Sequence, residues 1–283
     1  MRYSLAAIAA IAASVQAHGV VSEIQGANGV TMPGLSVQDG TPRNCASPLC
    51  GSEADTSIIR TREMGGKASA LGRTQGGGAV DAGAAISMFM GGAGAGAGAA
   101  AGAKRGFLDA LTGGGAGGAG AASAGTKSTG TEGGVAKAAG TGATSGLPTT
   151  ADDGTITMTF HQVNQDGAGP LTAQIDATSA GTDPAAFQDA TVMQNVPGIG
   201  IGGLSAAAVK DFPVKVQMPA GMTCSGTAGG ATNVCIVRMQ NAALAGPFGG
   251  SAAFTQSTAA KKRAVEYNLR KRHMARGILG KPE

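Results

Sequence analysis

A stretch of 71 residues, from Gly76 to Gly146, contains 24 glycines, 21 alanines and no proline. Side chains this small bury too little apolar area to offset the entropy of ordering the backbone. The composition therefore predicts a low-complexity Gly/Ala insert over residues 76–146 that forms no core of its own. Two patches with larger side chains, residues 84–90 and 104–111, predict short helices inside this insert.

The residues on either side of the insert, 18–75 and 147–258, number 58 and 112, which is enough for one domain with a hydrophobic core. In residues 155–161, apolar and polar side chains alternate, so that Ile156, Met158 and Phe160 share one face of a strand. Further strands are predicted at residues 19–25, 171–176, 214–218 and 234–239. Short strands between Gly/Pro turns predict a mainly β fold, an immunoglobulin-like antiparallel β-sandwich interrupted by the insert.

The N-terminus, residues 1–17, has the pattern of a secretory signal peptide. Arg2 precedes an apolar run over residues 5–15, and Val15 and Ala17 supply the small residues of a cleavage site. The run is too short to span a bilayer. Cleavage after Ala17 would make His18 the first residue of a secreted, extracellular protein with no transmembrane segment. An uncleaved anchor or a slightly shifted cleavage site are the alternatives.

The basic charge is confined to a tail, residues 259–283. This tail contains eight Lys or Arg and two Glu, a balance of +6, whereas the whole chain has +4, so the rest sums to −2. A uniformly basic nucleic-acid-binding domain is therefore excluded, and we expect a monomer with no nucleic-acid partner. The tail is either a basic helix for an anionic surface or a solvated extension, trimmed at its paired basic residues.

Four cysteines in a secreted chain predict two disulfides. Four cysteines allow three pairings, and the spacing does not decide between them. We favour Cys45 with Cys50 and Cys224 with Cys235, because each pair closes a short, turn-rich loop.

Histidine is the residue that points to chemistry. The chain has only His18, His161 and His273. With cleavage after Ala17, His18 offers both its α-amine and its imidazole to a metal, and His161, at the end of the strongly alternating strand, offers a second imidazole. Three nitrogens in this arrangement suit copper. A histidine at the end of a strand is otherwise a surface or core residue.

This arrangement resembles the copper site of lytic polysaccharide monooxygenases, whose second histidine precedes a Gly-Pro segment, as His161 precedes Gly169-Pro170 here. The resemblance implies an aromatic ring near the axial position of the metal, Phe248 or Phe254, and a hydrogen-bonding glutamine, Gln240 or Gln256. It also implies a polysaccharide as the partner. The chain departs from the pattern in having no Trp and, after the signal peptide, only one Tyr, so it lacks a flat aromatic platform.

Five segments carry a second, more extensive resemblance: residues 18–21, 41–45, 50–60, 233–238 and 241–250. They are similar to segments of the secreted fungal appressorium-associated Mas-type proteins, relatives of powdery-mildew early-infection proteins. This resemblance implies an extracellular protein made during host penetration and linked to virulence. Met239 and Ser251 stand where members of the family have cysteines, so a third disulfide is missing.

The remaining charged residues of the first segment are interpreted as a solvated ion-pair face: Arg60, Arg62, Arg73, Glu53, Asp55 and Glu63. Taken together, the sequence predicts a secreted fungal protein of the infection stage, associated with the cell wall or host surface and carrying a copper site at His18 and His161. The alternatives are a non-catalytic adhesion or effector protein, and a copper-binding protein without oxidative activity.

Overall fold

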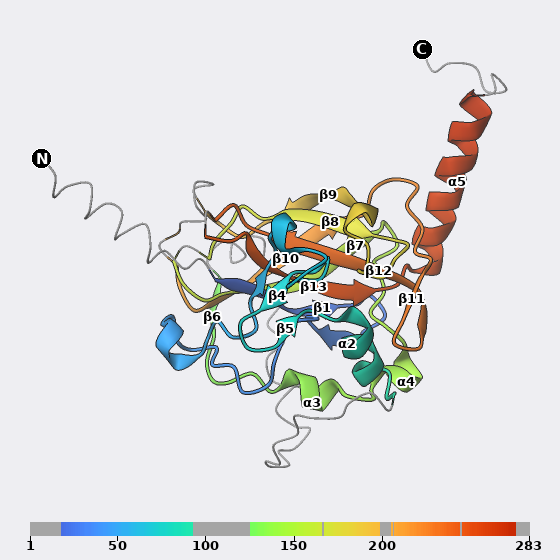
Figure 1. Cartoon of the computed structure of the whole chain (residues 1–283). Helices are drawn as coiled ribbons and strands as arrows, with labels where there is room; N and C mark the ends of the chain where they lie inside the picture. Colours follow the sequence, from blue (N-terminus) through green and yellow to red (C-terminus); the bar gives the residue numbers. More distant parts are fainter. Residues whose placement is uncertain are drawn as a thin grey trace, which may run out of the picture.

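The strands of this protein form one antiparallel sheet that folds over into two layers (Figure 1). The computed structural model describes residues 18–92, 125–165, 167–198, 205, 207–243 and 245–275. Among these residues the sheet runs in the order β2-β1-β7-β10-β9-β8-β12-β13-β3-β4-β5, with β6 paired to β10 and β11 paired to β12. The mainly β, antiparallel fold expected from the alternation is confirmed.

The first layer ends at β9, which also pairs with the second layer and so forms the fold between them. Its strands are β1 (Gly19–Gln25), β2 (Thr31–Pro33), β6 (Thr126–Lys127), β7 (Thr155–Gln162), β9 (Phe187–Gln194) and β10 (Lys210–Gln217). The strands of the second layer are β3 (Ser57–Ile58), β4 (Arg73–Thr74), β5 (Gly78–Ala79), β8 (Thr172–Asp176), β11 (Gly226–Ala228), β12 (Ala231–Gln240) and β13 (Phe248–Phe254).

The hydrophobic core lies between the two layers. Strand β7 contributes Ile156, Met158 and Phe160, each no more than 2% exposed, as its alternation predicts. At the edge away from β9, β13 of the second layer packs face to face on β1 of the first layer, and these two strands do not pair. A Cβ on Gly250 would lie 2.6 Å from the Val21 nitrogen, so only glycine permits this approach.

Both ends of the Gly/Ala insert, residues 76–146, contain helices and strands, whereas the sequence predicted an insert without a core of its own. On one side lie β5 and helix α2 (Ala82–Phe89), which Asp81 caps by accepting a hydrogen bond from the Ala84 nitrogen at 3.0 Å. Ile86 and Phe89 of α2 are buried in the core, which supplies the burial that glycine and alanine lack. The prediction of a helix near residues 84–90 is confirmed, whereas the one at 104–111 lies outside the described residues.

On the other side of the interval, β6 is followed by the short helices α3 (Gly134–Ala138) and α4 (Gly142–Ser145). Strand β6 pairs with the beginning of β10, and α3 packs near β2. These segments cover part of the outer face of the first layer. Three short 3₁₀ helices complete the described secondary structure: Pro48–Cys50, Thr61–Glu63 and Pro184–Ala186.

The C-terminal tail begins as a helix, α5 (Thr258–Ala275), which projects away from the sheets (Figure 1). None of the helices in the described ranges is both long enough and apolar enough to cross a membrane. The predicted disulfides, Cys45–Cys50 and Cys224–Cys235, are both present. The predicted signal peptide, residues 1–17, lies outside the described residues.

Candidate functional site

His18 is held at the beginning of β1 by polar contacts with the segment that follows β7. Its carbonyl oxygen accepts a hydrogen bond from the Val163 nitrogen at 3.0 Å, and its own nitrogen donates to Asn164 Oδ1 at 2.8 Å. In the full-length chain the His18 residue is 1% exposed. A Cβ on Gly167 would lie 1.9 Å from the His18 carbonyl oxygen, so the turn after β7 needs glycine to pass this close.

Glu53 is the charged group nearest the His18 ring. Its Oε1 atom lies 3.1 Å from His18 Nδ1 and accepts a hydrogen bond from Asn164 Nδ2 at 3.0 Å. Glu53 and Asp55 are 3% and 0% exposed, so the prediction that they belong to a solvated ion-pair face is wrong. Within the described structure, Arg60, Glu63 and Arg73 do form a half-buried ion-pair trio. A buried carboxylate needs a cation or strong donors close by, and His18 and Asn164 meet that need.

His161 lies on the face of β7 opposite Phe160. In the register of β1 with β7 it is the partner of Val20, two residues after His18. His18 and His161 are therefore diagonal neighbours on adjacent strands, a relationship that places Cα atoms about 7–8 Å apart. The register thus brings the two histidines to neighbouring positions on adjacent strands, and their shared metal site stays a prediction.

The Nδ1 atom of His161 is fully engaged. It lies 2.8 Å from Asp211 Oδ1 on β10 and 3.0 Å from Ser128 Oγ, while Ser128 also donates to Asp211 Oδ2 at 2.6 Å. Burial alone would raise the pKa of Asp211, but the hydrogen bonds from His161 and Ser128 outweigh it and lower that pKa below its ordinary value. An ionised Asp211 therefore favours the tautomer of His161 with the proton on Nδ1.

The other ring nitrogen of His161, Nε2, is buried and has no hydrogen-bond partner among the described residues. The same holds for His18 Nε2, and His18 Nδ1 has only the ion-pair approach of Glu53. Unpartnered nitrogens on two buried imidazoles are unusual, because buried polar atoms are normally satisfied. They are donor atoms available to a ligand.

Phe248, at the beginning of β13, packs against His18. The two ring centroids are 4.4 Å apart and the planes are tilted by 40°. Phe254 lies at the other end of the same strand, paired with Cys235 and buried in the core. Of the two phenylalanines expected near the metal, the structure brings only Phe248 to His18.

The two candidate glutamines lie elsewhere. Gln240 pairs with Gly249, the residue after Phe248, so its side chain faces away from the Phe248 ring. It lines a hollow of about 470 Å³ on the outer face of β8 and β9. The side chain of Gln256 accepts a hydrogen bond from the Cys224 nitrogen and donates one to the Met222 carbonyl oxygen, each at 2.9 Å. His273 lies exposed on α5, and neither glutamine contacts a site histidine in the described structure.

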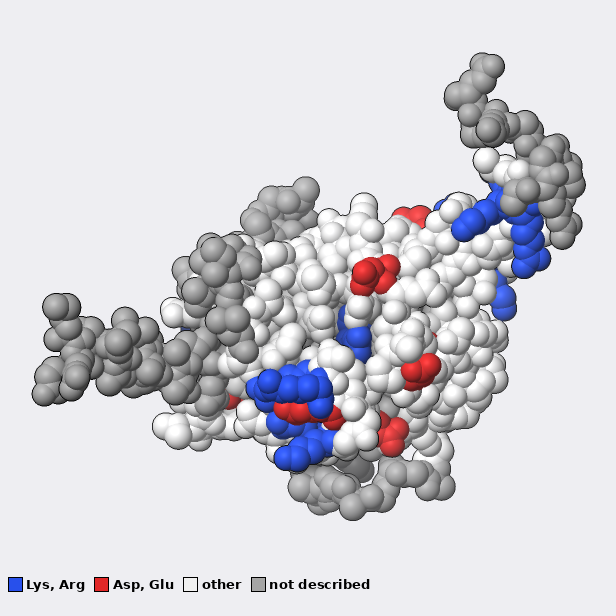
Figure 2. Space-filling model, turned by 45° about the horizontal axis from the view of Figure 1, so that its top comes forward, with Lys and Arg blue, Asp and Glu red and all other residues white. Residues whose placement is uncertain are grey.

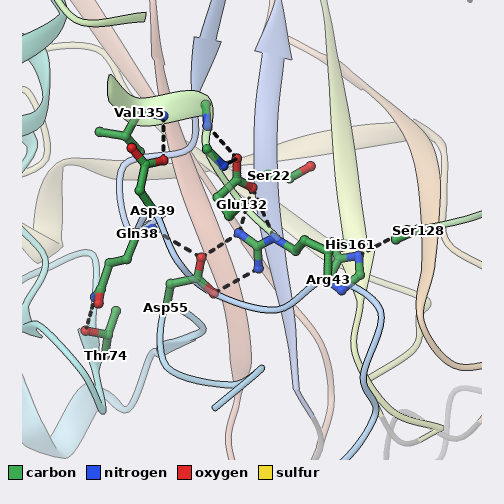
Figure 3. Close-up of polar contacts among 12 residues, drawn as sticks. Ser22, Gln38, Asp39, Arg43, Asp55, Thr74, Ser128, Glu132, Val135 and His161 are labelled. Carbon is green, nitrogen blue, oxygen red and sulfur yellow. Dashed lines mark hydrogen bonds and ion pairs between the residues drawn. The ribbon is translucent and has the colours of Figure 1, made fainter. Parts of the chain in front are cut away.

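A buried ion cluster holds the Glu53 segment in place (Figure 3). Arg43 contacts Asp55 through both terminal nitrogens, at 3.0 and 2.5 Å, and its Nε donates to Glu132 Oε2 at 3.0 Å. Burial lowers the pKa of Arg43, but the charges and hydrogen bonds of Asp55 and Glu132 outweigh burial and raise it. The cluster ties the segment that follows the Cys45–Cys50 loop to the segment that leads into α3.

A hollow of about 790 Å³ lies next to this cluster, between the outer face of the first layer and helices α3 and α4. Its polar lining includes Glu23, Thr159 and Asp211 from the strands, and Arg43, Glu132 and Lys137 from the covering segments. Asp211 therefore has two neighbours, the hollow on one side and the His161 ring on the other.

The structure reveals four residues that the sequence had not placed near the histidines: Glu53, Ser128, Asn164 and Asp211. Asp211 could have been found from the pattern of β10, where Phe212, Val214 and Val216 alternate into the core and so place Asp211 on the opposite face. Glu53 and Asn164 carried no such pattern. Among the described residues, no three side chains of His, Cys, Asp or Glu converge as a metal site, so a metal here would depend on the two imidazoles and the His18 nitrogen.

Comparison with known proteins gives a consistent result. The chain is 59% identical to the appressoria-specific virulence factor GAS2 of Pyricularia oryzae over 290 residues, covering 98% of this chain and 97% of that protein. It is 39% identical to the appressoria-specific virulence factor GAS1 of the same fungus over 129 residues, covering 44% of this chain and 50% of that protein. No solved structure matches the chain significantly. Residues 16–249 match the model of the Egh16-like virulence factors, and the chain belongs to this family.

Proposed function

We propose that this protein is a secreted, infection-stage copper protein that oxidises polysaccharide at the fungal cell wall or the host surface. The ligands of the copper are the α-amine and Nδ1 of His18, freed by cleavage after Ala17, and Nε2 of His161. The family membership supports the infection-stage role, and the contacts of the two histidines support the metal.

One observation carries the proposal: His161 Nδ1 is bound by Asp211 and Ser128, while Nε2 is buried and unpartnered. Metal-binding histidines typically donate their second ring N–H to a carboxylate, which fixes the tautomer and the orientation of the ring. A purely structural histidine in a closed environment would have both nitrogens satisfied.

The surroundings of His18 fit the second half of the site. Asn164 Oδ1 already accepts a hydrogen bond from the His18 nitrogen, and an α-amine keeps an N–H for it after cleavage. Glu53 Oε1, 3.1 Å from Nδ1, is placed to accept the proton that this nitrogen loses when a metal binds. Phe248 covers one side of the imidazole and keeps water from it.

Bound copper supplies one-electron chemistry and the activation of oxygen or peroxide. With hydrogen peroxide as the oxidant, a metal held by His18 and His161 would supply a net insertion of one oxygen atom into a C–H bond next to the glycosidic oxygen, with the other oxygen released as water. Loss of the glycosidic oxygen from the hydroxylated carbon would then break the chain. The contribution of the protein is the fixed nitrogen frame and the exclusion of water.

The hollow next to Asp211 supports a polyhydroxylated partner. Its lining residues include Ser22, Thr31, Thr141, Ser145 and Thr159, together with Glu23 on β1 and Asp211 on β10. Hydroxyl and carboxylate groups can exchange hydrogen bonds with sugar hydroxyls, and no aromatic platform is needed for this contact.

The proposal is tested by copper titration with electron paramagnetic resonance on secreted, correctly processed protein. We expect one Cu²⁺ per chain with a nitrogen-rich signal. We expect His161→Ala and a variant with an extra glycine before His18 each to lose that signal. The matched control is Asp189→Asn, which changes an exposed carboxylate of β9 and should leave the titration unchanged.

If the wild type binds one copper ion per chain and both site variants still bind it, the proposed ligands are wrong. If the wild type binds no copper, the proposed site is also wrong. The activity is tested separately, by incubating the copper-loaded protein with cell-wall polysaccharides, a reductant and peroxide, and analysing the products for oxidised ends. Copper binding without oxidised products would establish the metal site and reject the enzymatic part of the proposal.

A further inference from the structure

Helix α5 differs from the rest of the protein in charge and in packing. It contains six Lys or Arg and one Glu, and basic side chains gather on the projecting helix (Figure 2). These basic residues form two runs of three, residues 261–263 and 270–272. Consecutive residues on a helix point about 100° apart, so the two runs together spread their charge around the helix. An amphipathic membrane-binding helix would instead gather its charge on one face.

The first part of α5, residues 258–268, is anchored to the body of the protein. Ala260 and Ala264 are 5% and 7% exposed, and both pack against the body. Asn268 Nδ2 donates to the Gly221 carbonyl oxygen at 2.8 Å. These residues are spaced by four and form one buried stripe along the helix.

The second part of α5 extends beyond the body (Figure 1). Residues 269–274 are all exposed, with Leu269 at 46% and Met274 at 45%. Within the described structure, none of these side chains forms a hydrogen bond or an ion pair with the body. A helical segment of this length has little stability without tertiary packing, so it opens readily.

We propose that the chain is cleaved after Arg272 by a secretory-pathway endoprotease that recognises paired basic residues. Such proteases bind their substrate in an extended form, and the overhanging part of α5 can adopt that form without disturbing the core. Lys271-Arg272 supplies the basic pair, and Arg270 precedes it. The reaction is hydrolysis: water adds across the bond between Arg272 and His273, leaving a new carboxylate and a new amine.

The chain contains a second Lys-Arg pair, Lys262-Arg263, which a sequence pattern alone does not distinguish from the first. The structure separates them, because Lys262-Arg263 lies between the buried residues Ala260 and Ala264. Cleavage there requires the anchored part of the helix to detach, which exposes apolar surface. We therefore infer that this pair is protected in the folded protein.

This inference rests on secretion, which is part of the proposed function, but not on copper binding. The experiment is the intact mass of the full-length chain, expressed with its own N-terminus in a fungal host and collected from the medium. We expect a C-terminus at Arg272, or shorter by one to three residues where a carboxypeptidase removes the basic end. Lys271→Gln with Arg272→Gln should leave the chain intact to Glu283. The matched control, Lys262→Gln with Arg263→Gln, should be processed like the wild type.

A second measurement uses full-length chain from a host without the protease, digested with a purified Lys-Arg-specific endoprotease. Cleavage after Arg272 should be faster than cleavage after Arg263 by about 100-fold or more, because only the latter needs the anchored part to open. An intact Glu283 in secreted wild-type protein, or first cleavage after Arg263, would overturn the inference. Protein missing from the medium would instead count against secretion.

Discussion

His161 and Asp211 are partners in the register of β7 with β10, and their side chains meet, with Nδ1 2.8 Å from Oδ1. Ser128 closes a triangle by contacting both residues. The triangle joins three segments that are far apart in the sequence and leaves the Nε2 atom of His161 as its only unpartnered ring nitrogen. A ring fixed in this way presents one defined lone pair, which is what a metal site requires.

The first prediction concerns this triangle. Asp211→Asn removes the carboxylate that holds the Nδ1 proton of His161, so copper affinity should fall by about 10- to 100-fold. The measurement is competitive copper titration against a chelator of known affinity. Asp189→Asn, an exposed change on β9, is the control and should bind as the wild type does. Unchanged affinity in Asp211→Asn would show that this carboxylate does not orient a metal ligand.

The second prediction concerns Glu53. Glu53→Gln keeps an oxygen for Asn164 but removes the charge 3.1 Å from the His18 ring. Losing a charged hydrogen-bond partner in a buried environment costs about 2 kcal/mol, which lowers Tm by about 4–8 °C for a domain of this size. Thermal unfolding by circular dichroism measures the shift. Glu266→Gln, on exposed α5, should change Tm very little, and equal shifts in the two variants would refute a specific role for Glu53.

The third prediction concerns the ring that packs on His18. Phe248→Ala should destabilise the fold by about 3–5 kcal/mol, because it leaves a cavity at a residue that is 3% exposed. Phe248→Leu fills most of that space and should cost clearly less. Denaturant unfolding measures both. The ring protons of His18 should also shift in the NMR spectrum of each variant, since the ring at 4.4 Å is lost. If the His18 ring protons shift but the free energy of unfolding stays the same, the contact between Phe248 and His18 does not contribute to the packing.

The fourth prediction is a pH dependence at Asp176, which is fully buried at the end of β8. Burial raises the pKa of this carboxyl, but hydrogen bonds from Ser179, Thr178 and Gly181 outweigh burial and lower it. Its stabilisation is therefore complete above the unfolded pKa of about 3.9 and is lost as the pH falls through the lower folded pKa. The free-energy difference between wild type and Asp176→Asn should shrink below about pH 4. Asp189→Asn, an exposed change, should show no such dependence in the same denaturant series.

The fifth prediction separates the two disulfides. Cys224 and Cys235 are 3% and 0% exposed, whereas Cys50 is exposed in its loop. Thiol exchange requires access to a sulfur atom, so a mild reductant should open Cys45–Cys50 first. Replacing Cys224 and Cys235 by alanine should cost about 3 kcal/mol in loop entropy and more through lost packing. Mass spectrometry after timed alkylation measures the order, and earlier opening of the buried bond would contradict the prediction.

Much of the fold could be predicted from local patterns. The alternation of Ile156, Met158 and Phe160 identified β7 and its buried face, and the residues predicted for the N-terminal strand are those of β1. The favoured local pairing of the cysteines, which the spacing alone did not decide, is the one present. The Gly/Ala interval was predicted less well, because Ile86 and Phe89 of α2 gain their stability from core residues that a local composition count does not include.

Without predicting β9 or β13, the sequence by itself determined the alternation of β7 and the residues of β1, favoured the two short cysteine loops, and singled out His18 and His161 as the histidines to consider. Each of these properties depends on spacing along the chain. Only the tertiary structure decided what surrounds the histidines. Asn164 lies 146 residues from His18 and 111 from Glu53, and Ser128 lies 83 residues from Asp211. Contacts over such separations depend on how the layers pack and on strand register, which no local pattern of residues specifies.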